Sequence, residues 1–138
     1  MGQALILETT FLVDLEREAS RGEVGPAHEF LEENRDRELC IVLTTAGEMA
    51  CGPSMDQRGP WETLVGRFRV LTPDLESSWA YGQRYRYLKD NGLLIGANDL
   101  WIAAVAIVQG LPLVTRNTRH FKRVPGLRVV SYGESPET

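Results

Sequence analysis

The sequence predicts an α/β fold in which a central parallel sheet of five strands lies between two layers of helices. Five short apolar runs occur along the chain, and most are continuous rather than alternating, as expected of strands covered on both faces. Helix-like segments separate these runs, an order typical of parallel strands joined by helical crossovers. The length of 138 residues suits one core, so we expect one domain over residues 1–132 and a short polar tail over 133–138.

The strands and helices are predicted in turn from the N-terminus. The apolar runs predict strands over Ala4–Leu7, Leu39–Leu43, Phe68–Leu71, Leu111–Val114 and Leu127–Val130. Apolar residues at helical spacing, together with proline, glycine and capping residues, predict the helices between them. These are Thr10–Ser20, Pro26–Arg37, Thr45–Cys51, Asp56–Arg67, Asp74–Asp90 and Asp99–Gln109.

The helix boundaries rest on particular residues. The turn sequence "GEVG" precedes the second helix, and Gly52-Pro53 ends the third. Thr72-Pro73 predicts an N-cap followed by proline at the first helical position, and Asn91-Gly92 ends that helix. The last long helix contains "LWIAAVAIV" and is apolar almost all round, so we expect it to be buried at the centre of the fold, ending at Gly110.

Composition and charge exclude several classes of protein. The net charge of −4 argues against a general nucleic-acid coat and leaves acids available for a metal site. No apolar run approaches the roughly 20 residues that span a bilayer, and the N-terminus lacks the features of a signal peptide. Cys40 and Cys51 form no metal-binding pair, and we expect Cys40 to be a buried thiol in a cytoplasmic protein.

Four polar residues are expected at the edge of the sheet where its parallel strands end. Glu8 directly follows the first strand, and Glu48 lies one turn into the helix after the second. Asp99 opens the buried helix, and Asn117 follows the fourth strand. Ligands of open α/β sheets bind beyond the carboxyl ends of the strands, so these side chains could converge there. Three carboxylates in one cleft repel one another unless a cation lies among them, and oxygen ligands suit Mg²⁺ or Mn²⁺.

Each of these residues also has a purely structural interpretation. Glu48 lies three residues after Thr45, which is the spacing of a capping box. Asp99 at a helix start favours the helix dipole, and Asn117 could cap the turn after the fourth strand. Glu8 could cap a helix or pair with an arginine. The sequence leaves these alternatives open.

Four stretches of the chain resemble the PIN-domain family, and more narrowly the ribonuclease toxins of the VapBC toxin–antitoxin type. They are "LILETTFLVDL" (5–15), "TTAGEMACG" (44–52), "GANDLWIAAVAIVQGLPLVTRNTRHF" (96–121) and "PGLRVVSY" (125–132). The resemblance implies a three-layer α/β/α PIN-like domain and an endoribonuclease that depends on Mg²⁺ or Mn²⁺. It also implies a cognate antitoxin that blocks the site, and a homodimer.

The resemblance gives each polar residue a role by its position. Glu8 stands where the family has its first acid, normally aspartate, while Glu48 and Asp99 match the second and third acids. These three are the implied metal ligands. Asn117 completes the implied catalytic set, at a place where toxin-type members often have asparagine. Thr10 matches the hydroxyl residue that accompanies the first acid.

Glutamate at position 8 is a departure from the family. Its extra methylene lengthens the side chain by roughly 1.5 Å, whereas catalytic groups need placement to about 0.5 Å. We hypothesise that metal binding persists with reduced or altered activity, and an engineered substitution that disarms a toxin fits equally well. The alternative is a catalytically impaired PIN-like binding module that acts through antitoxin binding and operon autoregulation.

Basic residues near the acids are candidates for RNA contact, because RNA must approach an acidic site. Arg116 and Arg119 flank Asn117 and are, with Thr10, the predicted substrate-binding residues. The long fifth helix adds basic residues that could equally face solvent and tyrosines that could stack on bases or cover the core. These are Arg84, Arg86 and Lys89, with Tyr81, Tyr85 and Tyr87.

The remaining candidates have a leading structural interpretation. Asp14 is expected to be a surface residue or the partner of an arginine, and His28 and His120 to have surface or capping roles. Met55 and Trp61 either pack in the core or line an antitoxin groove, which the resemblance places at this segment and the first two helices. A phospho-acceptor receiver domain is discounted, because the third strand is followed by Thr72-Pro73 rather than by aspartate.

Overall fold

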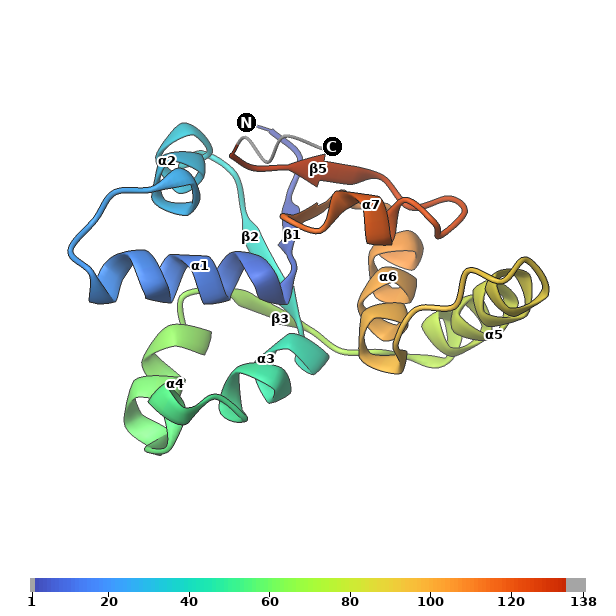
Figure 1. Cartoon of the computed structure of the whole chain (residues 1–138), viewed down its shortest axis with the longest axis horizontal. Helices are drawn as coiled ribbons and strands as arrows, with labels where there is room; N and C mark the ends of the chain where they lie inside the picture. The colour runs from blue at the N-terminus through green and yellow to red at the C-terminus, as the bar shows by residue number, and fades with distance from the viewer. Residues whose placement is uncertain (1, 134–138) are drawn as a thin grey trace.

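A five-stranded parallel sheet forms the centre of the protein (Figure 1). The structure is a computed structural model, and it describes residues 2–133. The strands are β1 (Leu5–Leu7), β2 (Leu39–Val42), β3 (Arg69–Leu71), β4 (Leu113–Thr115) and β5 (Val129–Ser131), in the spatial order β3-β2-β1-β4-β5. Ile6 on the central strand pairs with Cys40 on one side and Leu113 on the other. The predicted parallel sheet is confirmed.

Helices cover both faces of this sheet. They are α1 (Thr9–Ser20), α2 (Pro26–Glu33), α3 (Leu43–Ala50), α4 (Arg58–Val65), α5 (Leu75–Asp90), α6 (Ala97–Gln109) and α7 (Thr118–Phe121), with a 3₁₀ turn η1 (Pro53–Met55). Buried residues of α1–α4 pack with Leu5 and Leu7 of β1 on one face. Buried residues of α5–α7 pack with Ile6 on the other. The three-layer α/β/α prediction is therefore correct, and continuous apolar strands follow from burial on both faces.

The caps of α3 and α5 differ from those that the sequence suggests. Helix α3 begins at Leu43, directly after β2, and its N-cap Val42 makes no side-chain cap. The capping box between Thr45 and Glu48, which the sequence left open as an alternative role for Glu48, is therefore absent. Helix α5 is capped by Asp74, which exchanges hydrogen bonds with Ser77 in a true capping box, so Thr72-Pro73 lies before the helix.

Other bounds differ by a few residues. Helix α2 ends at Glu33 instead of Arg37, and the helix expected over 56–67 is the shorter α4, which a separate 3₁₀ turn over 53–55 precedes. Strands β4 and β5 each lie one or two residues later than predicted. The short helix α7 between β4 and β5 was not predicted, because a single turn carries no helical periodicity.

Helix α6 is the buried central helix that the sequence predicts. Its residues from Leu100 to Ala106 are buried except for Trp101, and Gly110 ends it with a left-handed φ of 67°. The helix begins two residues earlier than expected, which places Asp99 in its first turn. Cys40 is a buried free thiol, as predicted. Among residues 2–133, no helix combines the length and the apolar character needed to cross a membrane.

Candidate active site at the carboxyl edge of the sheet

Glu8 occupies a buried position at the end of the central strand. Its side chain is only 2% exposed, and its Oε1 accepts hydrogen bonds from the hydroxyls of Thr10 (2.6 Å) and Thr115 (2.5 Å). Burial raises the pKa of this carboxyl, and the nearby charge of Asp99 adds to the effect, while the two hydroxyls oppose it. Glu8 forms no ion pair with an arginine among the described residues, so that structural interpretation does not apply.

Glu48 and Asp99 face a shared hollow beside Glu8. The hollow is lined by these two acids and by residues 96–98 at the start of α6. Glu48 Oε1 accepts from the Thr9 hydroxyl (2.5 Å), and its Oε2 accepts a longer hydrogen bond from Asn98 (3.4 Å). Asp99 Oδ2 lies 2.8 Å from Nε2 of His120 on α7. Both acids thus hold fixed positions at the rim of the sheet.

The donor atoms at this edge suit a hard cation, because carboxylate oxygens dominate and no thiol takes part. The arrangement is looser than the sequence predicts. Within the part of the chain that the structure describes, no three histidine, cysteine or acidic side chains form a group that could hold a metal ion. Glu48 and Asp99 share one hollow, whereas Glu8 turns Oε1 toward two hydroxyls. The carboxylate oxygens present suit an oxygen-liganded ion chemically. Glu48 and Asp99 are the two acids that would hold it, because they line the same hollow.

Asn117 lies in the loop between β4 and α7, held by its backbone. Its N–H donates to the Thr115 hydroxyl (2.9 Å), and the preceding N–H, of Arg116, donates to the Thr10 hydroxyl (3.2 Å). Asn117 occupies the N-cap position of α7, but its side chain makes no cap hydrogen bond. The side-chain amide is therefore not committed to the capping role that the sequence left open.

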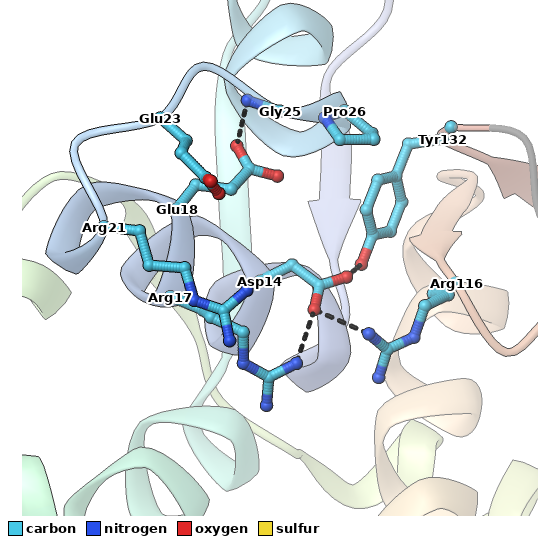
Figure 2. A pocket seen from close by; sticks show the side chains of 10 residues that line it. Asp14, Arg17, Glu18, Arg21, Glu23, Gly25, Pro26, Arg116 and Tyr132 are labelled. Atoms are coloured by element: carbon cyan, nitrogen blue, oxygen red, sulfur yellow. Dashed lines mark hydrogen bonds and ion pairs between the residues drawn. The ribbon is translucent and has the colours of Figure 1, made fainter.

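The Arg116 side chain is held by Asp14 on α1. Figure 2 shows Asp14 between Arg17, Arg116 and Tyr132. Arg116 Nη1 lies 2.6 Å from Asp14 Oδ1, and the Tyr132 hydroxyl lies 2.6 Å from Oδ2. Burial and the hydrogen bond to Asp14 raise the pKa of Tyr132. Asp14 is thus the arginine partner that the sequence allowed, and it ties α1 to the loop after β4.

A pocket opens next to this cluster, between α1, α2 and the end of β5 (Figure 2). Glu18 on its wall accepts hydrogen bonds at 3.0 Å from the N–H groups of Gly25, Ala27 and His28, and the His28 ring lies at 2.7 Å. Burial works to raise the pKa of Glu18, but these hydrogen bonds outweigh it and lower the pKa. The acid therefore caps α2 from a neighbouring helix, and the His28 ring contacts this capping acid instead of capping a helix itself.

A second groove runs between α1, α3 and η1. Its lining includes Thr9, Val13, Glu48, Met49 and Pro53. The groove reaches Glu48, so an occupant would lie against the second acid. Met55 and Trp61 belong to the core beneath: Met55 is buried, and the Trp61 indole N–H donates to the carbonyl of Ala46 (2.9 Å).

The other predicted RNA-contact residues are divided between surface and core. Arg119 on α7 is exposed. It forms no ion pair with any residue that the structure describes. Tyr81 packs its ring against Trp101 at 4.4 Å, which is the core-covering role. Tyr85 and Tyr87 are exposed. Of the basic residues on α5, Arg84 donates to the carbonyl of Pro125 (3.3 Å).

Three functional-site residues were missed by sequence reasoning. Thr9 binds Glu48, Thr115 binds Glu8, and His120 binds Asp99. His120 was assigned a surface or capping role, yet its ring contacts the third acid directly. The usable signals were that His120 stands three residues after Asn117 at the start of a short helix, and that Thr115 ends a strand beside the first acid.

Comparison with known proteins agrees with the family predicted from the sequence. The PIN domain family model matches residues 5–127. The chain is 38% identical over 137 residues to "Ribonuclease VapC" of Rickettsia bellii, covering 92% of this chain and 95% of that one. It is 39% identical to "Ribonuclease VapC1" of Methanocaldococcus jannaschii, covering 91% and 85%. A match to "Ribonuclease VapC2" of Rickettsia felis, 36% identical, spans only about half of each chain (48% and 49%).

Solved structures share the fold. A VapBC2 complex from Rickettsia felis, bound to a promoter DNA fragment, superposes with a TM-score of 0.77 at 23% identity, over 94% of this chain and 99% of the other. A DNA-bound VapBC from Salmonella typhimurium gives 0.73 at 26% identity, over 94% and 98%. Both likenesses extend over nearly the whole described chain, so the sheet edge that carries the acids lies in the matched region.

Proposed function

Because the chain belongs to the PIN-domain family, we propose that it is an endoribonuclease dependent on Mg²⁺ or Mn²⁺ and the toxin of a type II toxin–antitoxin pair. The observation that carries this proposal is the hollow that both Glu48 and Asp99 line, with the buried Glu8 at the end of the central strand. The relatives at 38% and 39% identity are named as ribonucleases, which supports the same activity.

The proposed chemistry divides between the ion and the chain. When bound, the ion would supply charge for a phosphate oxygen and an activated water, as in other metal-dependent hydrolases. Glu48 and Asp99 would hold it, with Glu8 behind them. His120 fixes the orientation of Asp99 by its 2.8 Å contact. Arg119, exposed on α7, would hold the RNA backbone.

Cleavage of single-stranded RNA tests this function. We expect cleavage with Mg²⁺ or Mn²⁺ and none with excess EDTA, measured on a fluorescently labelled oligonucleotide. Asp99→Asn and Glu48→Gln should each lower kcat/KM by about 100-fold or more, because each removes a charged holder of the ion. Asp90→Asn, at the far end of α5, is the matched control and should match the wild type. Cleavage that persists in EDTA or in Asp99→Asn would contradict the proposal.

The second candidate function is a binding module with impaired catalysis. It is favoured by one observation, which is that Glu8 directs Oε1 to Thr10 and Thr115 rather than into the hollow. Glu8→Asp separates the two. If glutamate is a handicap, the aspartate variant gains cleavage rate and Mn²⁺ affinity, measured by calorimetry. No gain in either quantity would sink the idea that Glu8 limits this site.

The groove between α1, α3 and η1 is the proposed seat of an antitoxin segment. Apolar Val13 and Met49 line it, and Glu48 lies along it, so a bound chain would cover the second acid. Complexes named VapBC share the fold, which supports a partner of this kind. Val13→Glu should weaken antitoxin binding by about 10-fold or more in calorimetry, since Val13 is only partly buried and the change places a charge in the groove. Antitoxin binding equal to that of the wild type would exclude this groove as the antitoxin site.

A further inference from the structure

Thr115 has no role in the chemistry described so far, yet it occupies a central place in the site. The residue is fully buried at the end of β4. Its hydroxyl lies 2.5 Å from Glu8 Oε1 and also accepts the backbone N–H of Asn117 at 2.9 Å. A hydroxyl has one hydrogen to donate, and the Thr115 oxygen already accepts the Asn117 N–H. The hydrogen of Thr115 therefore points to Glu8, and its lone pairs face the loop.

Thr10 makes the same arrangement from α1. Its hydroxyl lies 2.6 Å from the same Oε1 of Glu8 and accepts the backbone N–H of Arg116 at 3.2 Å. Two successive N–H groups of the β4–α7 loop are thus joined to one carboxylate oxygen through two hydroxyls. These links connect segments more than 100 residues apart in the chain, 107 for Thr115 and Glu8.

We propose that Thr115 is a positioning residue of this site, which couples Glu8 to the loop that carries Arg116 and Asn117. The inference rests on the proposed ribonuclease function. It also accounts for glutamate at position 8. The glutamate side chain, longer than that of aspartate, brings Oε1 within hydrogen-bond distance of Thr115 on the neighbouring strand as well as of Thr10. Thr115 touches neither substrate nor ion; it acts by fixing where the Asn117 amide and the Arg116 guanidinium project.

The test compares Thr115→Val with Thr115→Ser. Valine keeps the shape and removes the hydroxyl, whereas serine keeps the hydroxyl. Thr63→Val is the matched control, since Thr63 is an exposed residue on α4 whose hydroxyl bonds only to the Gly59 carbonyl. One readout is amide hydrogen exchange of Asn117 by NMR, which requires neither metal nor RNA. The other is the split between kcat and KM for RNA cleavage.

We expect Asn117 amide exchange to be at least 10-fold faster in Thr115→Val, with kcat lowered at least 10-fold and KM within about 2-fold. Thr115→Ser should restore both quantities to within about 3-fold, and Thr63→Val should change neither. In a Glu8→Gln background the Thr115→Val effect on kcat should shrink, because the two residues act through one connection.

Each contrary result has a distinct meaning. Unchanged Asn117 exchange in Thr115→Val, or serine failing to rescue it, would overturn the positioning role whatever the protein's activity. Unchanged kcat alongside faster exchange would also overturn it, since the loop would then move without consequence. A wild type that cleaves no RNA would instead defeat the proposed function, while the exchange readout would still decide whether Thr115 holds the loop.

Discussion

At the scale of single residues, the positions of the acids were predictable and their partners were not. Glu8 directly follows β1 and Asn117 lies two residues after β4, so the carboxyl-edge rule for α/β sheets was enough to place both at the same edge. Their hydrogen bonds involve Thr115, which lies one residue beyond the predicted fourth strand and was given no role. A threonine hydroxyl changes partners with small rotations, and no periodicity in the sequence records its direction.

Glu8 provides a stability prediction with a definite sign. Burial raises its pKa above the ordinary 4.5, so the folded protein retains this proton to a higher pH than the unfolded chain does. Stability contributed by the protonated form is therefore lost as pH rises from 4.5 through the folded-state pKa. Glu8→Gln in EDTA should be more stable than the wild type at pH 7 and nearly equal to it at pH 4, measured by urea unfolding. A difference in unfolding free energy between Glu8→Gln and the wild type that stays constant from pH 4 to pH 7 would contradict the prediction.

Glu18 should behave in the opposite sense. Hydrogen bonds lower its pKa below 4.5, so the stability it contributes is present above pH 4.5 and lost as pH falls through the folded-state pKa. Glu18→Gln should cost about 2 kcal/mol of unfolding free energy at neutral pH, because charged hydrogen bonds to three backbone N–H groups are weakened. The exposed Glu23→Gln is its control. The difference between Glu18→Gln and wild type should close in acid, and a loss that persists there would point to packing instead.

At the scale of elements, periodicity predicted every long helix and strand, and errors concentrated at the ends. The buried helix α6 was recognised because its apolar residues leave almost no polar face. The start of α5 was misplaced because Thr72-Pro73 and Asp74 both match capping rules. Ser77 lies three residues after Asp74 in the sequence, but only the folded chain shows that its hydroxyl turns back to the Asp74 N–H.

The cap of α5 can be checked directly. Asp74→Ala should lower the unfolding free energy clearly, since it removes the acceptor for the Ser77 N–H. Thr72→Ala, two residues earlier, should leave stability within about 0.5 kcal/mol. Thermal and urea unfolding of the two variants give the comparison. Equal losses of stability in the two variants would instead support Thr72 as the cap, as the sequence alone predicted.

At the scale of the whole molecule, the fold and family were correctly predicted, whereas the assembly stays a prediction. We propose a homodimer formed through α5, where Leu75 is 84% exposed and Trp79, one turn later, is 64% exposed. Large apolar side chains so exposed are costly in a monomer and common at the centre of interfaces.

Replacement of Trp79 tests this dimer. Trp79→Glu should shift the protein from dimer to monomer in analytical ultracentrifugation, with the dissociation constant raised at least 10-fold, because the glutamate would be buried without a partner. Tyr87→Glu, another exposed aromatic on the same helix, is the control. A wild-type protein that sediments as a monomer would show that α5 does not form a dimer interface.

The topology of the sheet has a consequence for synthesis. Helix α1 and strand β1 leave the ribosome first, but β1 pairs with β4, and Glu8 meets Thr115 only across 107 residues. At about 5–20 residues per second, roughly 5 to 20 seconds separate the translation of the two halves of the site. If the proposed function holds, a growing chain is harmless for most of its elongation. The groove between α1, α3 and η1 is made from residues 9–54. An antitoxin could therefore bind this groove before the segment that carries Asp99 and Thr115 has been translated.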